Sequence, residues 1–449
     1  MQALLISTYE MGRQPFGLAS PAAWLRAAGW TVALVDTAKE PLADDAIAGA
    51  DLVGFYLPMH TATRLASPII TRVRHLNPRA HICGYGLYAP LNGEWLRSLG
   101  VDEVLGGEFE ADLTEYARTI AEPGRVPDSR SVVHTLPRIH FLVPDRTGLP
   151  GLDRYATLQR ADGTRALVGY TEASRGCRHL CRHCPVVPIY NGQFRVVQPE
   201  VVLADVASQV AAGASHITFG DPDFFNGPTH AMRIVQGLHA AHPPVTYDVT
   251  IKIEHLLAHD DLLPRLRDTG CLFITSAVES IDDVVLARLE KGHTRSDFVR
   301  AVEKCREIGL TIVPTFVAFH PWLTLGDYCE FLDTIDALDL VDHVAPIQLA
   351  IRLLVPEGSR LLELGEVREL VGPFDPATLT YRWKHRDPDV DRLQEDVAAI
   401  VGVKIGRSRR ATFDAISDLA HERAGRLRPA SRPARDRATV PYLNEPWYC

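Results

Sequence analysis

The chain has 449 residues, of which 46% are hydrophobic and 23% are charged, and its formal net charge is −9. This composition is typical of a folded protein with two or three domains and excludes global disorder. The acidic balance speaks against a nucleic-acid partner, and no apolar run approaches the ~20 residues that span a bilayer. Eight cysteines without a secretory signal pattern predict a protein of the reducing cytoplasm.

The first 122 residues alternate short apolar runs with amphipathic stretches. The runs that predict strands are 3–8, 31–36, 51–58, 81–86 and 102–107. Apolar strands that alternate with helices such as 61–76 are typical of a doubly wound parallel sheet, covered on both faces. We therefore expect a Rossmann-like domain over residues 1–122, with any ligand at the carboxyl ends of its strands.

A second alternation follows a segment rich in Pro, Arg and Asp, residues 123–166, which has the composition of a linker. The later predicted strands are 167–173, 214–220, 245–251, 271–279, 310–319 and 343–351. Six strand–helix units favour a partial (β/α)6 barrel over residues 167–360. Residues 361–449 are expected to form a helical extension and an irregular Arg- and Pro-rich tail ending at Cys449.

Three of the cysteines lie together as CxxxCxxC, at Cys177, Cys181 and Cys184, directly after a predicted strand. Three closely spaced thiolates suit a cubane iron–sulfur cluster, and the fourth iron would keep an open coordination position. Two alternatives are a zinc site completed by His179 or His183, and cysteines that bind no metal.

Three arginines surround this cysteine motif, Arg175, Arg178 and Arg182. Cations close to thiolates lower the thiolate pKa and offset the negative charge of a cluster. We therefore expect these side chains to face the cysteines.

The motif CxxxCxxC after the first strand of an α/β barrel resembles the signature of radical S-adenosylmethionine (SAM) enzymes. The resemblance implies that Cys177, Cys181 and Cys184 hold a 4Fe–4S cluster and that SAM chelates the fourth iron. The residue before the third cysteine is usually aromatic in this family. It is His183 here, which is expected to lie near the adenine region of SAM.

Downstream segments resemble the same family in the expected order. FGDPDFF places Asp221 and Asp223 where the family binds the SAM amino group, although Asp-Pro-Asp is also ordinary turn chemistry. The segment 276–294 resembles GxESxxxxxLxxxxKGxT and implies that Glu279 and Ser280 face the SAM ribose or carboxylate, although a capped amphipathic helix would read the same way. Glu254 would offer a further polar group to SAM.

The N-terminal domain resembles the cobalamin-binding type that precedes the barrel in part of the family. The family's histidine-ligand motif DxHxxG is absent, because the corresponding loop reads TYEMGRQPFG at residues 8–17. Either cobalamin binds without a histidine ligand, or the domain keeps the fold without the cofactor.

The chain ends in EPWYC, and as a whole it resembles a group of radical SAM proteins whose tail reads CUAEP or CCAEP, with U for selenocysteine. The resemblance implies a native chain that continues past Cys449 through a selenocysteine codon, and a redox or ligand-active tail. The pair of Cys449 with that selenocysteine would then be a soft, low-pKa nucleophile or metalloid ligand that acts in catalysis, whereas the composition alone favours a disordered end.

The combined expectation is a radical SAM enzyme that reductively cleaves SAM and modifies a small-molecule substrate. The resemblance implies an external electron donor of the ferredoxin or flavodoxin type. Two alternative reactions are cobalamin-dependent methyl transfer and aminocarboxypropyl transfer to a soft acceptor such as arsenic. The rival from another class is a non-catalytic zinc or iron–sulfur sensor protein. We expect no membrane association and no nucleic-acid substrate.

Overall fold

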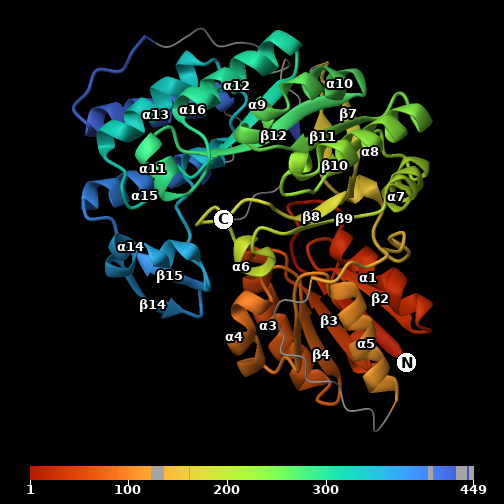
Figure 1. Cartoon of the computed structure of the whole chain (residues 1–449). Coiled ribbons are helices and arrows are strands. Elements are labelled where there is room, and N and C mark those ends of the chain that lie inside the picture. The colour runs from red at the N-terminus through yellow and green to blue at the C-terminus, as the bar shows by residue number, and fades with distance from the viewer. Residues whose placement is uncertain (123–135, 161, 403–407, 431–441, 444–449) are drawn as a thin grey trace.

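The computed structural model describes residues 1–122, 136–160, 162–402, 408–430 and 442–443. Two sheets follow one another along the chain, the first in the red and orange part of Figure 1 and the second in its green and blue part. Each sheet is predominantly parallel and is built by strands that alternate with helices, as the sequence predicts.

The first sheet has the order β2-β1-β3-β4-β5 and is parallel throughout. Its strands are β1 Gln2–Ser7, β2 Thr31–Asp36, β3 Leu52–Tyr56, β4 His81–Tyr85 and β5 Glu103–Leu105. Its helices are α1 Phe16–Ala27, α2 Asp44–Ala48, α3 His60–Leu76, α4 Gly93–Ser98 and α5 Phe109–Ala121. Helices α1 and α5 pack on one face and α2 to α4 on the other, so that both faces are buried and the predicted Rossmann-like fold is confirmed.

The second sheet has the order β13-β12-β11-β10-β7-β6-β16 and curls into a half-barrel. Its parallel strands are β7 Arg165–Thr171, β10 His216–Phe219, β11 Thr246–Thr250, β12 Cys271–Glu279 and β13 Thr311–Phe316. Strand β6 (Thr157–Gln159) from the Pro-rich segment adds to β7, and β16 (Tyr442–Leu443) adds to β6, both antiparallel. The predicted partial α/β barrel is confirmed.

The helices of the second unit cover the outside of this half-barrel (Figure 1). They are α7 Pro199–Ala211, α8 Pro228–Ala241, α9 Ile253–Ala258, α10 Leu263–Asp268, α11 Asp283–Arg288, α12 Arg295–Ile308, α13 Leu325–Ala337, α15 Pro388–Gly402 and α16 Arg409–Arg423. Helix α12 begins with a capping box between Thr294 and Asp297 and ends at Gly309, whose φ of 81° permits the left-handed C-cap. The smaller elements are α6 Val187–Tyr190, α14 Gly365–Leu370, and the strand pairs β8 Ser174–Gly176 with β9 Phe194–Val196 and β14 Val371–Asp375 with β15 Thr380–Trp383.

The segment 343–351 is not the sixth strand that its apolar pattern predicts. It forms a 3-10 helix at Pro346–Leu349. Pro346 has no N–H to donate to a ladder, and the side-chain oxygen of Gln348 accepts the hydrogen bond from the Phe316 N–H at 2.9 Å. Just after this segment the chain forms an isolated parallel bridge between Phe319 and Arg352.

Candidate active site

The three predicted cluster cysteines lie on one loop between β8 and α6. Gly176 ends β8 with a φ of 77°, and a Cβ there would lie 2.5 Å from the Gln193 carbonyl oxygen, so only glycine fits. The Cys177 N–H donates to this same carbonyl at 3.1 Å, which fixes the start of the loop. Cys177 and Cys181 are buried, Cys184 is half-buried, and all three thiols are free.

Two buried lysines, not the neighbouring arginines, face these thiols. Lys252 Nζ lies 3.9 Å from Cys181 Sγ, and Lys252 and Lys291 are only 6% and 3% exposed. Burial alone lowers the pKa of Lys291, but Glu279, Cys181 and Cys184 raise it above its usual value. The Lys291 ammonium therefore stays charged, and both side chains are placed to offset the negative charge of a thiolate-bound cluster.

The expectation that the three arginines face the cysteines is wrong, because carboxylates and a backbone carbonyl elsewhere in the fold bind them. Arg175 pairs with Glu108, Glu110 and Glu172. Arg182 pairs with Glu290 and Glu363, and Arg178 donates to the Asn226 carbonyl. Sequence proximity to the cysteines did not determine the direction of these long side chains.

Two predicted SAM-contacting residues, His183 and Glu279, meet beside the cysteine loop. His183 Nε2 lies 3.1 Å from Glu279 Oε1, and Lys291 Nζ lies 3.4 Å from the same oxygen. Burial alone raises the pKa of Glu279, but Lys291 and His183 outweigh burial and lower the pKa to about 2. Glu279 has a φ of 69°, a strained conformation for a residue with a side chain, at a break in the pairing of β12 with β13.

Ser280 and Glu254, two further predicted SAM contacts, lie in different surroundings. Ser280 follows Glu279 and accepts a hydrogen bond from the Asp282 N–H at 3.1 Å. Both Glu279 and Ser280 line a cavity of about 260 Å³ that also reaches His320. Glu254 lies in the first turn of α9, with its side chain 44% exposed, and is 3.5 Å from both Lys252 Nζ and His179 Nδ1.

The two aspartates of FGDPDFF point to different partners. Asp221 accepts hydrogen bonds from the Ala173 N–H at 2.9 Å and the Ser174 hydroxyl at 2.5 Å, and burial raises its pKa to about 7. Asp223 Oδ2 instead lies 2.7 Å from His255 Nδ1 and 3.5 Å from His179 Nε2. Asp221 thus anchors the strand that leads into the cysteine loop, whereas Asp223 lies beside it.

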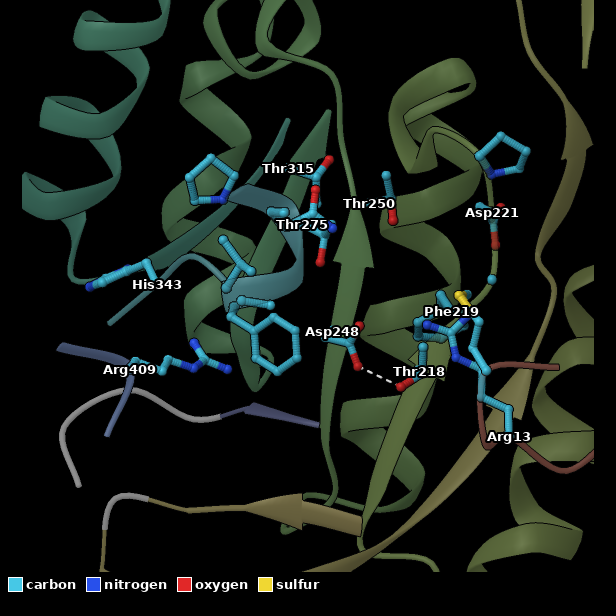
Figure 2. A pocket seen from close by; sticks show the side chains of 18 residues that line it. Arg13, Thr218, Phe219, Asp221, Asp248, Thr250, Thr275, Thr315, His343 and Arg409 are labelled. Carbon is cyan, nitrogen blue, oxygen red and sulfur yellow. Dashed lines mark hydrogen bonds between the residues drawn. The ribbon is translucent and has the colours of Figure 1, made fainter. Parts of the chain in front are cut away.

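A cavity of about 320 Å³ fills the interior of the half-barrel (Figure 2). Four successive strands contribute threonine side chains to it, Thr218, Thr250, Thr275 and Thr315. Two buried carboxylates line this cavity, Asp221 and Asp248, and Asp248 accepts hydrogen bonds from Thr218 Oγ1 at 2.6 Å and, with the proton assigned there, from His216 Nε2 at 2.9 Å.

Other parts of the chain close this barrel cavity. Met11 and Arg13 reach it from the loop after β1, and His343 and Arg409 reach it from the C-terminal part of the chain. Apart from Asp221, the residues that line this cavity were not predicted as site residues from the sequence. Polar residues two apart on a predicted strand, such as Asp248 and Thr250, were the signal, because alternate side chains of a strand point to the same face.

A larger cavity, about 770 Å³, lies at the carboxyl edge of the first sheet. It is lined from the ends of β1 and β2, from α3 and α4, and by Pro376 and Ala377 of the turn between β14 and β15. At the end of β1, the buried Ser7 hydroxyl and one Glu10 carboxylate oxygen have no hydrogen-bond partner in the described part of the chain. The position and volume of this cavity fit part of a cobalamin, at the edge where doubly wound sheets bind ligands.

A buried ion cluster joins the first sheet unit to the cysteine loop. Arg175 donates to both carboxylate oxygens of Glu110, at 2.8 and 2.6 Å, and to Glu172 at 2.6 Å. The rings of Phe109 and Phe141 lie 5.1 and 5.0 Å from its guanidinium carbon. Burial alone raises the pKa of Glu110, but Arg175 lowers it below its usual value, so the pair is ionised inside the protein.

The donor set fits the iron–sulfur cluster that the sequence predicts. Three free thiols lie on one loop, buried cations lie next to them, and Tyr88 and Leu91 of the first unit pack on the same apolar cluster as Cys177 and Cys184. Cys449, the predicted catalytic residue of the tail, lies outside the described residues. No helix in the described part of the chain has both the length and the apolar character to cross a bilayer.

Comparison with known proteins identifies a radical SAM domain. The model of the radical SAM superfamily matches residues 171–335. The tRNA-2-methylthio-N(6)-dimethylallyladenosine synthase of Parafrankia sp. is 28% identical over 184 residues, which cover 37% of this chain and 35% of that protein. The bacteriochlorophyllide d C-8(2)-methyltransferase of Chlorobaculum tepidum is 27% identical over 171 residues, 36% of this chain and 37% of that protein. The chain thus spans about a third of the length of these relatives.

Two solved structures share the fold of nearly the whole chain. The cobalamin-dependent SAM radical enzyme OxsB, with aqua-cobalamin and SAM bound, has a TM-score of 0.71 at 15% identity, covering 94% of this chain and 72% of that one. The radical SAM methyltransferase TsrM of Kitasatospora setae, with tryptophan and a SAM analogue bound, has a TM-score of 0.68 at 17% identity, covering 94% and 96%. The combination of a Rossmann-like sheet with a radical SAM half-barrel is therefore established, and the family implies a 4Fe–4S cluster and SAM.

Proposed function

We propose, from the radical SAM domain that residues 171–335 form, that this chain is a cobalamin-dependent radical SAM enzyme acting on a small molecule inside its barrel. One observation carries the proposal. The loop after β1 lines both cavities, with Thr8 and Tyr9 at the edge of the first sheet and Met11 and Arg13 in the barrel. A cofactor at the sheet edge would lie next to a substrate in the barrel.

Cys177, Cys181 and Cys184 are assigned as the cluster ligands. When bound, the cluster supplies the electron that cleaves a carbon–sulfur bond of SAM. Lys252 and Lys291 stabilise the thiolates electrostatically from their buried positions. Tyr88 and Leu91, which pack with the cysteines, exclude water from this part of the site.

Residues around the cysteine loop would hold SAM. The carboxylates of Asp223 and Glu254 are the acceptors for its ammonium group, since Asp221 is already occupied by Ala173 and Ser174. His183, fixed by Glu279, would contact the adenine, and Glu279 and Ser280 would face the ribose or carboxylate across the cavity that they line.

The barrel cavity is the proposed substrate site. Its threonine hydroxyls and Asp248 offer hydrogen bonds to polar groups, and about 320 Å³ is room for a small molecule only. A nucleic acid is a second candidate substrate, because the curated relatives include an enzyme named as acting on tRNA. This relative weakens the expectation that the substrate is not a nucleic acid. A base inserted into the barrel would then take the place of the free small molecule.

Methyl transfer is the reaction that we favour, because the curated relatives include a methyltransferase and the fold is shared with cobalamin-dependent enzymes. The experiment supplies anaerobically reconstituted protein with SAM, a reductant such as reduced flavodoxin, and cobalamin or none, and identifies the SAM fragments by mass spectrometry. S-adenosylhomocysteine that forms only with cobalamin supports the proposal. 5′-Deoxyadenosine alone would indicate hydrogen abstraction, and methylthioadenosine would indicate aminocarboxypropyl transfer. If SAM is not consumed in any sample, the proposal that the chain is a radical SAM enzyme is contradicted.

A further inference from the structure

Cys177 has neighbours that form a second set of metal ligands. One ligand atom each of Cys177, His179 and Asp223 lies within 4.8 Å of the other two. A thiolate, an imidazole and a carboxylate are the donors that Zn²⁺ and other divalent first-row transition ions bind. The sequence pattern did not show this set, because Asp223 comes from the segment after β10 and not from the cysteine motif.

His255 of α9 lies next to two of these three residues, Asp223 and His179. Its Nδ1 lies 2.7 Å from Asp223 Oδ2, and its ring centroid lies 4.7 Å from that of His179. Asp223 is fully buried, and the side chains of His255 and His179 are 12% and 16% exposed. Tetrahedral coordination of a single ion needs four donors of this kind.

The polar atoms of this group contact one another. His179 Nε2, His255 Nδ1 and Asp223 Oδ2 are buried, and both nitrogens contact this one oxygen, at 3.5 and 2.7 Å, without well-formed hydrogen-bond geometry in the described part of the chain. Three buried donor atoms that converge in this way can be satisfied by a cation that they bind together.

The other two cysteines are not members of this group. The Cys181 thiol lies next to the Lys252 ammonium. The Cys184 thiol lies close enough to Lys291 for the lysine charge to stabilise its thiolate. Cys177 is therefore the single thiol shared between a three-cysteine cluster site and a site for one ion.

We propose that the cluster-free protein binds one divalent transition ion, such as Zn²⁺ or Fe²⁺, through Cys177, His179, Asp223 and His255. Binding forms metal–sulfur, metal–nitrogen and metal–oxygen bonds and releases the thiol proton of Cys177, with no change of oxidation state. Because the cluster needs the same thiol, the ion and the cluster exclude each other. This inference is independent of the proposed function.

The test titrates reduced, cluster-free full-length protein with Co²⁺, whose visible absorption reports tetrahedral coordination and whose near-ultraviolet band reports a thiolate ligand. We expect one Co²⁺ per chain, displaced by Zn²⁺. Cys177→Ser should abolish the thiolate band, and His255→Ala should weaken binding at least tenfold. Cys184→Ser is the matched control, because it removes a cluster ligand but leaves this site intact and should bind Co²⁺ as the wild type does.

Two results would overturn the proposal. The first is Co²⁺ binding that Cys184→Ser and Cys181→Ser weaken as much as Cys177→Ser does, since the ion would then sit among the three cysteines. The second is binding that His255→Ala and His179→Ala leave unchanged. The variants at His255 and His179 are preferred to one at Asp223, because Asp223 also accepts the Phe225 N–H and its replacement could prevent folding. The readout involves neither SAM nor the cluster, so it is separate from the test of enzymatic function.

Discussion

Arg175, two residues before Cys177, donates two hydrogen bonds to the carboxylate of Glu110, at 2.8 and 2.6 Å. Glu110 belongs to α5 of the first sheet unit, and the two side chains are 7% and 0% exposed. A bidentate, buried ion pair thus connects the cysteine loop to the Rossmann-like unit. The relative placement of the two proposed cofactor sites depends on this contact.

Replacing Arg175 should therefore destabilise the joined structure. Arg175→Met leaves the buried charge of Glu110 without its partner and is expected to cost about 3 kcal/mol of unfolding free energy. Urea unfolding of the cluster-free protein measures this loss. Arg118→Met is the control, because Arg118 and Glu115 are 54% and 47% exposed and their pair should contribute about 0.5 kcal/mol or less. Equal effects of the two substitutions would refute the argument.

Glu279 should make stability depend on acid pH. Its pKa is about 2 in the folded protein against an ordinary value of 4.5, so its stabilising effect is complete above the ordinary value and is lost as pH falls toward the folded one. The full difference corresponds to about 3 kcal/mol. The stability gap between wild type and Glu279→Gln, measured by urea unfolding, should shrink as pH is lowered from about 6 to about 3. The exposed Glu94→Gln is the control, and a gap that does not change with pH would contradict the ion-pair account.

Filling the barrel cavity should lower substrate turnover without loss of the iron–sulfur cluster. Thr275→Phe places a ring among the threonines that line the cavity, whereas Thr311→Phe alters the same sheet outside its lining. We expect Thr275→Phe to lower product formation at least tenfold while the cluster content stays normal, and Thr311→Phe to have little effect. Product assays and iron analysis provide the comparison. Normal turnover by Thr275→Phe would place the substrate elsewhere.

Lys252 should tune the reduction potential of the cluster. Removing a buried cation 3.9 Å from Cys181 Sγ favours the oxidised, less negative cluster. Lys252→Met is expected to shift the midpoint potential negatively by about 60 mV, a tenfold change in the reduction equilibrium. Lys304→Met, at a side chain that is 39% exposed and paired with Asp260, should leave the potential unchanged. A positive shift in a redox titration of Lys252→Met would show that the charge argument is wrong.

Cys449 remains a prediction from the sequence. If the tail acts in catalysis, Cys449→Ser should lower product formation at least tenfold while cluster content and cleavage of SAM are unaffected. Cys271→Ser, at a buried thiol on β12, controls for general oxidation sensitivity. Wild-type turnover by Cys449→Ser would remove the tail from the mechanism.

The sequence predicted both sheets because their strands are apolar runs bounded by polar loops. The segment 343–351 has the same apolar character, but the missing N–H of Pro346 and the bond from Phe316 to the Gln348 side chain prevent a strand. A run of apolar residues indicates that a segment is buried, but it does not distinguish a buried strand from a buried 3-10 helix.

For the site, the motif placed the three cysteines on one loop, and the contact between His183 and Glu279 is a finding of the structure that the spacing did not predict. The motif could not locate the cations, since Arg175 turns to a carboxylate 65 residues away, whereas Lys252 reaches the cysteine loop from 71 residues away. Long side chains are placed by tertiary packing and by the charges that it buries, neither of which is local in sequence.

Electron paramagnetic resonance of the reduced, reconstituted protein tests the central claim most directly. An open fourth iron predicts a 4Fe–4S signal that changes shape when SAM is added and that Cys181→Ser abolishes. His179→Ala and His183→Ala should keep the signal, because no histidine is needed to complete the cluster. A signal that SAM does not alter, or a protein that holds zinc and loses it in either histidine variant, would contradict the radical SAM account.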